Sequence, residues 1–112
     1  MSLDVKKQRE IQPVWEGVEL CRYYYKSEKI SFGTSTLDAG ETGEIDPGHP
    51  NSQEIFYVIK GCAKVCVPGK EEHFLNEGDA ILIPEGLPHQ LMNPGNSTSV
   101  IGWSIAPGLK FD

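Results

Sequence analysis

The chain has 112 residues, of which 38% are hydrophobic and 23% charged, and its 16 acidic and 10 basic residues give a formal net charge of −6. This length suits one domain of roughly 100–150 residues, and the composition excludes a disordered chain. The apolar runs are far shorter than the ~20 residues of a membrane-spanning helix, and the basic residues lack the concentrated face that nucleic acid or an anionic membrane requires.

The first 13 residues form a polar arm in which a short helix is the most regular structure expected. They carry the one cluster of basic residues, Lys6, Lys7 and Arg9, and no apolar stretch typical of a secretory signal. The chain has three cysteines, and this odd number does not make a disulfide framework. We therefore expect a cytoplasmic protein with reduced thiols and with neither nucleic acid nor a membrane as partner.

From Gly33 onward, a glycine or a proline recurs every few residues, and the chain holds 12 and 8 of them. These breakers exclude a long helix after the N-terminal arm. Short runs rich in Val, Ile, Phe and Tyr lie between them and predict strands at residues 18–25, 31–37, 55–60, 63–68, 80–83, 89–93 and 99–105. Short strands at this spacing indicate an all-β sandwich or barrel.

Two histidines and one glutamate lie beside turn residues that can bring distant segments together. His49 follows Asp-Pro-Gly and precedes Glu54 by five residues, and His89 follows a turn rich in proline and glycine. Imidazole nitrogens and carboxylate oxygens are ligands that Zn, Fe, Mn and Ni accept. On spacing alone, a hydrogen-bonded structural role competes with a metal site for both histidines.

Residues 78–93 resemble the second motif of the cupin superfamily at every defining position. That motif is Gly, five residues, Pro, one residue, Gly, two residues, His, three residues and Asn. Its fixed positions here are Gly78, Pro84, Gly86, His89 and Asn93. Residues 43–61 resemble the first motif, and the 16 residues between the two motifs also match the length found in cupins. The fixed positions of the first motif are Gly43, His49, Glu54 and Gly61.

The first motif departs from the family pattern at one position. The family usually has His, one residue and His, followed three or four residues later by Glu. With Glu54 fixed by its distance to Gly61, His49 takes the second histidine position and Pro47, which cannot bind metal, takes the first. Placing His49 first would put Asn51 second, too close to Glu54, so we prefer the former alignment.

The resemblance implies an all-β fold, the double-stranded β-helix or jelly-roll β-barrel of a small cupin, as one domain over residues 1–112. Residues 1–29 would form an N-terminal arm and edge strands, and residues 30–108 the barrel core. A barrel of this size can hold one small ligand among its inward side chains. Because such a barrel exposes sheet edges, we expect a closed two-fold homodimer, and the arm and the strand at 18–25 are the candidates for its exchanged or paired edge.

By the same resemblance, three metal ligands survive: His49, Glu54 and His89. Asp46, Asn51 or Gln53 could supply a weak fourth donor. The implied cofactor is a divalent ion, with Fe, Mn, Zn and Ni all compatible. Side chains five apart in a strand point to opposite faces, so a loop or bulge must separate His49 from Glu54.

Other residues are expected to have structural roles. Phe56, Met92 and Trp103 are candidates for apolar cavity walls, and His73 beside a hairpin is expected to face solvent. Asn93, although part of the motif, is better explained by hydrogen bonding in a turn than by catalysis.

Two classes of function fit these features. The first is a metal-dependent enzyme of dioxygenase, isomerase or lyase type, in which the ion acts on a small polar organic molecule as a Lewis acid or redox centre. The second is a non-catalytic cupin that binds a small molecule or sugar, or acts as a sensor, and whose metal site is degenerate. The sequence offers no further acid–base pair beside the ligands, so metal stoichiometry is the property that separates the two classes.

Overall fold

The computed structural model describes residues 2–109, which form ten β-strands and one short 3₁₀ helix at Gln8–Glu10. The strands are β1 (Val14–Glu16), β2 (Glu19–Lys26), β3 (Ser31–Leu37), β4 (Thr42–Asp46), β5 (Gln53–Lys60), β6 (Cys62–Val67), β7 (Glu71–Asn76), β8 (Ala80–Ile83), β9 (His89–Met92) and β10 (Ser99–Ala106). Within the described part of the chain, no helix has the length and apolar character needed to cross a membrane.

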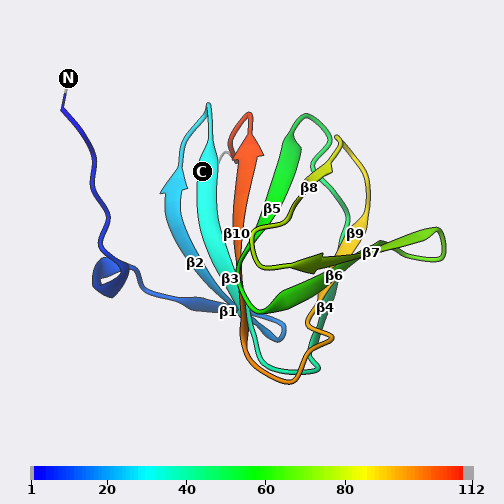
Figure 1. Ribbon diagram of the computed structural model, residues 1–112. Helices are drawn as coiled ribbons and strands as arrows, with labels where there is room; N and C mark the ends of the chain where they lie inside the picture. Colours follow the sequence, from blue (N-terminus) through cyan, green and yellow to red (C-terminus); the bar gives the residue numbers. More distant parts are fainter. Residues whose placement is uncertain (1, 110–112) are drawn as a thin grey trace.

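The strands form two antiparallel sheets that enclose a single hydrophobic core (Figure 1). The order is β1-β2-β3-β10-β5-β8 in the six-stranded sheet and β4-β9-β6-β7 in the four-stranded sheet. Both sheets contribute buried apolar side chains to the core: Leu37, Phe56, Val58, Ala63, Val65, Ile83, Leu91, Ile101, Trp103 and Ile105. This arrangement confirms the all-β jelly-roll barrel expected from the strand spacing.

Every strand predicted from the sequence is present, with ends moved by no more than two residues, but β1, β4 and β7 were not predicted. β7 reads Glu-Glu-His-Phe-Leu-Asn. It is mostly polar because this edge strand is mostly exposed and, within the described part of the chain, pairs with β6 alone. β4 contains Gly43, which looks like a strand breaker. A Cβ at Gly43 would lie 2.9 Å from the carbonyl oxygen of Leu91, so this glycine permits close approach of the neighbouring strand.

The strand predicted at 18–25 is not a sheet edge, which corrects the expectation for this segment. β2 pairs with β3 on one side and with β1 on the other, because the residues that directly follow the N-terminal arm pair with β2 as β1. The edges of the six-stranded sheet are therefore β1 and β8. Trp15 in β1 is 68% exposed, so apolar surface remains on this edge.

Candidate metal centre

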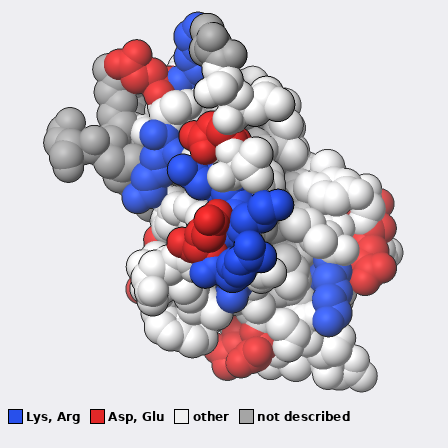
Figure 2. Space-filling view, turned by 90° about the vertical axis from the view of Figure 1, so that its left-hand side faces the viewer, with Lys and Arg blue, Asp and Glu red and all other residues white. Residues whose placement is uncertain are grey.

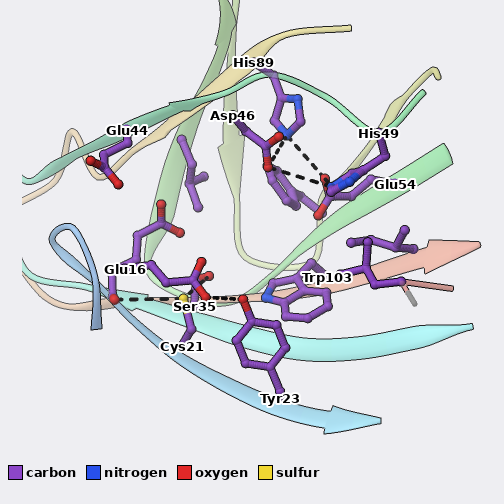
Figure 3. Close-up of a pocket in the computed structure, with 15 residues that line it drawn as sticks. Glu16, Cys21, Tyr23, Ser35, Glu44, Asp46, His49, Glu54, His89 and Trp103 are labelled. Carbon is purple, nitrogen blue, oxygen red and sulfur yellow. Dashed lines mark hydrogen bonds and ion pairs between the residues drawn. The ribbon is translucent and has the colours of Figure 1, made fainter. Parts of the chain in front are cut away.

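The side chains proposed as ligands converge at one end of a cavity between the two sheets (Figure 3). Asp46, the last residue of β4, pairs in register with His89, the first residue of β9. Glu54 lies on β5 in the opposite sheet, next to Ile83 of β8 and Ile105 of β10. Residues more than 40 positions apart in the chain thus meet because strands of both sheets end at the same opening.

A loop between β4 and β5 brings His49 to this cavity. Residues 47–52 form no strand, which confirms the break that the five-residue separation required. The loop packs directly on the turn that precedes His89. A Cβ at Gly48 would lie 2.8 Å from the carbonyl carbon of Gly86, and the amide of Gly86 donates a 2.9 Å hydrogen bond to the carbonyl oxygen of His49.

The donor atoms of the four side chains lie within a few ångströms of one another. Nε2 of His89 is 3.2 Å from Oε1 of Glu54 and 3.7 Å from Oδ2 of Asp46. Nε2 of His49 is 3.6 Å from Oε1 of Glu54 and 3.8 Å from Oδ2 of Asp46. Asp46, His49 and Glu54 each offer a ligand atom within 4.8 Å of the other two. Imidazole nitrogens and carboxylate oxygens at this spacing could share one divalent ion.

Two buried atoms at this centre have no hydrogen-bond partner: Oε1 of Glu54 and Nε2 of His89. The two residues are only 5% and 2% exposed. An unsatisfied buried polar group costs about 1–3 kcal/mol. Nδ1 of His89 lies 2.9 Å from the carbonyl oxygen of Leu87, which can only accept, so Nδ1 carries a proton. When the ring is neutral, Nε2 therefore presents its lone pair to the centre. The donors therefore fit a metal ion, which would satisfy both atoms.

The charges at the centre depend on one another. Burial alone would raise the pKa of Glu54, but the proximity of His49 and His89 outweighs burial and lowers it. Glu54 in turn raises the pKa of His49 against the effect of burial. Burial lowers the pKa of His89, yet Glu54 and the Leu87 carbonyl raise it overall. The metal-free histidines therefore hold protons more tightly than ordinary histidines, and a metal ion must displace those protons.

Asp46 is the one of the three possible fourth donors that lies at the centre. Asn51 is exposed in the loop. Gln53 is exposed on β5, where it precedes Glu54 and so points to the opposite face. Asp46 is adjacent to Pro47, the position where the cupin pattern has its first histidine, so the carboxylate at the centre comes from one residue before the missing imidazole.

The cavity that ends at this centre has a volume of about 170 Å³. Phe56 and Trp103 line it, which confirms two of the predicted apolar walls, and the ring of Phe56 packs edge-on against His89 with centroids 5.6 Å apart. Met92 is not among the lining residues, which corrects the third prediction. Met92 follows Leu91 on β9 and therefore points to the opposite face.

The other end of the cavity is lined by a cluster of side chains that was not predicted from the sequence. Its side chains are Glu16, Glu19, Cys21, Tyr23, Ser35 and Glu44. The Tyr23 hydroxyl donates to the Glu16 carboxylate, and the Cys21 thiol lies 3.6 Å from Oγ of Ser35 (Figure 3). Glu19, Cys21 and Tyr23 alternate along β2, and this period of two was the available signal for a shared inward face. Burial raises the pKa of Cys21 to about 11, so its sulfur is a neutral thiol at pH 7.

Glu19 gives a test of the electrostatics at this end. Burial and then the nearby carboxylates raise its pKa, although the hydroxyl of Ser35 opposes them. A carboxyl group whose pKa is raised by folding destabilises the folded state when it is ionised. We expect Glu19→Gln to raise the free energy of unfolding of the metal-free protein at pH 7, and this gain to vanish as the pH falls below the pKa of an ordinary glutamate. Urea denaturation at pH 7 and at about pH 4 measures both values.

The exposed Glu85→Gln substitution, outside the cavity, is the matched control and should change stability little at either pH. A loss of stability in Glu19→Gln at pH 7 would show that the charged form of Glu19 is favoured by folding, contrary to this assignment.

Comparison with known proteins agrees with the fold. A family model described as "Cupin domain" matches residues 33–105. Mannose-1-phosphate guanylyltransferase of Salmonella montevideo is 32% identical over 83 residues, which cover 69% of this chain and 17% of that protein. 3-Hydroxyanthranilate 3,4-dioxygenase of Candida albicans is 36% identical over 74 residues, which cover 62% of this chain and 42% of that protein. The chain thus spans less than half the length of either relative.

A solved structure extends the likeness to almost the whole chain. An uncharacterized protein with a double-stranded β-helix domain from Klebsiella pneumoniae matches with a TM-score of 0.80 and 20% identity, covering 96% of this chain and 92% of that one. At this level of identity the match shows a common fold. It adds the N-terminal strands to the region that the family model covers.

Proposed function

Because the chain belongs to the cupin domain family, we propose that it binds one divalent metal ion in its barrel and a small polar organic molecule beside that ion. His49, Glu54 and His89 would hold the ion. Asp46 would act as the fourth, weaker donor. The ion could be Fe, Mn, Zn or Ni, since all four accept imidazole and carboxylate ligands.

The observation that carries this proposal is the pair of buried atoms without partners. A histidine and a glutamate with purely structural roles would use their polar atoms in hydrogen bonds to the protein. Here Nδ1 of His89 is used in that way, but its Nε2 and Oε1 of Glu54 face each other at 3.2 Å without an acceptable hydrogen bond. Such an arrangement stabilises a bound cation at the expense of the empty protein.

The bound ion would supply Lewis-acid or redox chemistry to a molecule in the cavity. The chain's own residues would position that molecule: the rings of Phe56 and Trp103 form apolar walls, and the carboxylates at the far end provide polar contacts. The two curated relatives are named a guanylyltransferase and a dioxygenase. We infer a metal-dependent enzyme as the first function and a non-catalytic ligand-binding cupin as the alternative.

A titration of the metal-free protein with Co²⁺, followed by visible absorption, tests the donor set. We expect one ion per chain and a spectrum of a nitrogen- and oxygen-ligated ion. Asp46→Ala should weaken binding by about tenfold, because it removes a donor that approaches both histidines. Asn51→Ala, an exposed change in the adjoining loop, should leave affinity and spectrum unaltered. Equal affinities for the two variants would remove Asp46 from the proposed site.

We also propose that the protein is a cytoplasmic homodimer. Cys21, Cys62 and Cys66 are free thiols, as in a reducing compartment. Apolar side chains are exposed on the outer face of the six-stranded sheet, and clusters of this kind mark interaction surfaces in soluble proteins. They include Ile55, Tyr57 and Ile59 of β5 and Leu82 of β8, each 45–54% exposed.

A further inference from the structure

We propose that the molecule bound in this cavity is a small organic cation, with its positive group held at the end opposite the metal centre. This inference deepens the proposed function by naming the ligand class of the same cavity. It starts from the charges that line the cavity. Among the described residues that line it, five carry carboxylates and none is a lysine or an arginine.

Two of the five carboxylates, Asp46 and Glu54, belong to the metal centre, and a divalent ion would balance their charge. The other three are Glu16, Glu19 and Glu44, which lie on β1, β2 and β4. With or without a metal ion, the cavity therefore presents negative charge to its ligand. An anionic ligand would meet repulsion here, whereas a cation would be attracted and concentrated at the opening.

Two glycines leave room for the carboxylates at the polar end of the cavity. Oε2 of Glu19 occupies space that a side chain at Gly43 would fill, because a Cβ there would lie 2.7 Å from it. Glu44 reaches back across the opening to Gly17, where a Cβ would lie 3.1 Å from its carboxyl carbon. The carboxylates of the two sheets thus cross the same end of the barrel in opposite directions, and two glycines leave room for them.

Two further observations support the binding of a ligand in this cavity. The buried Oε1 of Glu54 and Nε2 of His89, which have no hydrogen-bond partner, face the same cavity. The aromatic side chains of Tyr23, Phe56 and Trp103 also line the cavity, and aromatic rings attract ammonium groups. The ring of Tyr23 already contacts an ammonium group, since Nζ of Lys26 lies 4.4 Å from its centroid. Lys26 itself does not line the cavity.

The described lysine and arginine side chains lie outside the cavity. The view from the β1–β2 side shows Lys and Arg groups gathered on the outer surface, with Asp and Glu groups between them (Figure 2). Among the described residues, no lysine or arginine lines the cavity, which leaves the interior carboxylates for a cation that comes from solution.

Choline and 3,3-dimethylbutan-1-ol test this inference, because they have nearly the same shape and differ in charge. Calorimetric titrations use protein with and without Zn²⁺, and 3,3-dimethylbutanoate serves as the anionic probe. We expect choline to bind at least about tenfold more tightly than the alcohol in both forms, and the anion to bind most weakly. Equal binding of choline and the alcohol, or tighter binding of the anion to the metal-free protein, would overturn the inference.

Matched variants test which carboxylates cause the preference for choline. The triple substitution Glu16→Gln, Glu19→Gln and Glu44→Gln should abolish the preference for choline. The triple substitution Glu71→Gln, Glu72→Gln and Glu85→Gln changes the net charge equally outside this cavity and should keep the preference. Glu44 is exposed, so Glu44→Gln alone is the variant to use if the triple variant does not fold. It should reduce the preference for choline over the alcohol. A preference that survives in the cavity variants would contradict the assignment.

Zinc content measured on the same samples separates this inference from the proposed function. Zinc uptake without a preference for choline would overturn the cation site and leave the metal site intact. A preference for choline without zinc uptake would support the cation site and contradict the metal site.

Discussion

The His89→Ala variant is expected to lose stable metal uptake, with a fall in affinity of roughly 100-fold or more. His89 is the histidine whose Nε2 lies nearest to the buried carboxylate, at 3.2 Å from Oε1 of Glu54, and also approaches Asp46 at 3.7 Å. Its ring is held by the hydrogen bond to Leu87 and by the packing of Phe56. Elemental analysis after incubation with Zn²⁺ and gel filtration measures the metal that remains bound.

His73→Ala is the matched control for this experiment. His73 has a side chain that is 51% exposed on β7 and pairs with Glu71, as expected for a histidine beside a hairpin. Its removal should leave the metal content unchanged. Because His89 is buried, a far-ultraviolet circular dichroism spectrum must show that His89→Ala is folded, and His89→Gln provides a variant of closer size. Equal metal content in the wild type and both His89 variants would eliminate the site as described.

The Asn93→Ala variant is expected to lose about 2–4 kcal/mol of folding free energy without losing the metal site. Asn93 is 2% exposed. Its Nδ2 donates to the carbonyl oxygens of Leu37, Asp38 and Ser97 at 2.8–3.2 Å, and its Oδ1 accepts from the amide of Gly95 at 3.0 Å. Alanine would remove all four of these hydrogen bonds, including the one to the carbonyl oxygen of the buried Leu37. Urea denaturation gives the change in stability.

Asn93→Asp distinguishes the donor role from simple packing. The carboxylate keeps the size of the amide, but it places a negative charge against the carbonyl oxygens that Nδ2 now satisfies. We expect it to be at least as destabilising as alanine at pH 7. Bound zinc should remain at one ion per chain in both variants below their unfolding transitions, since Asn93 does not line the cavity. A full loss of zinc from folded Asn93→Ala would assign Asn93 to the site.

The fold was largely predictable, because turn residues and apolar runs mark most strands directly. β3 and β8 have the predicted ends, and the loop that separates His49 from Glu54 follows from side-chain alternation alone. The strands that escaped prediction lack that signal. β4 and β7 are edge strands of the four-stranded sheet, where one side of the strand has no partner strand among residues 2–109 and polar residues are tolerated.

The sequence predicted three ligands of the candidate site, but it could not identify the fourth donor or the carboxylates at the far end of the cavity. His49, Glu54 and His89 stand out because turn residues and motif spacing surround them. Asp46 could not be chosen over Asn51, because the choice depends on the in-register pairing of β4 with β9, which no local pattern encodes. The carboxylates at the far end were missed for a related reason: Glu16, Glu19 and Glu44 come together only when β1 folds back on β2 and the two sheets close.

The position of a bound ion is the central claim, and anomalous diffraction from crystals grown with Zn²⁺ tests it most directly. The account predicts one strong anomalous peak per chain inside the barrel, bonded to His49, Glu54 and His89. Data collected on both sides of the zinc absorption edge identify the element. Zinc found on surface groups such as His73 and Glu71, with no peak between His49, Glu54 and His89 at saturating zinc, would contradict the account.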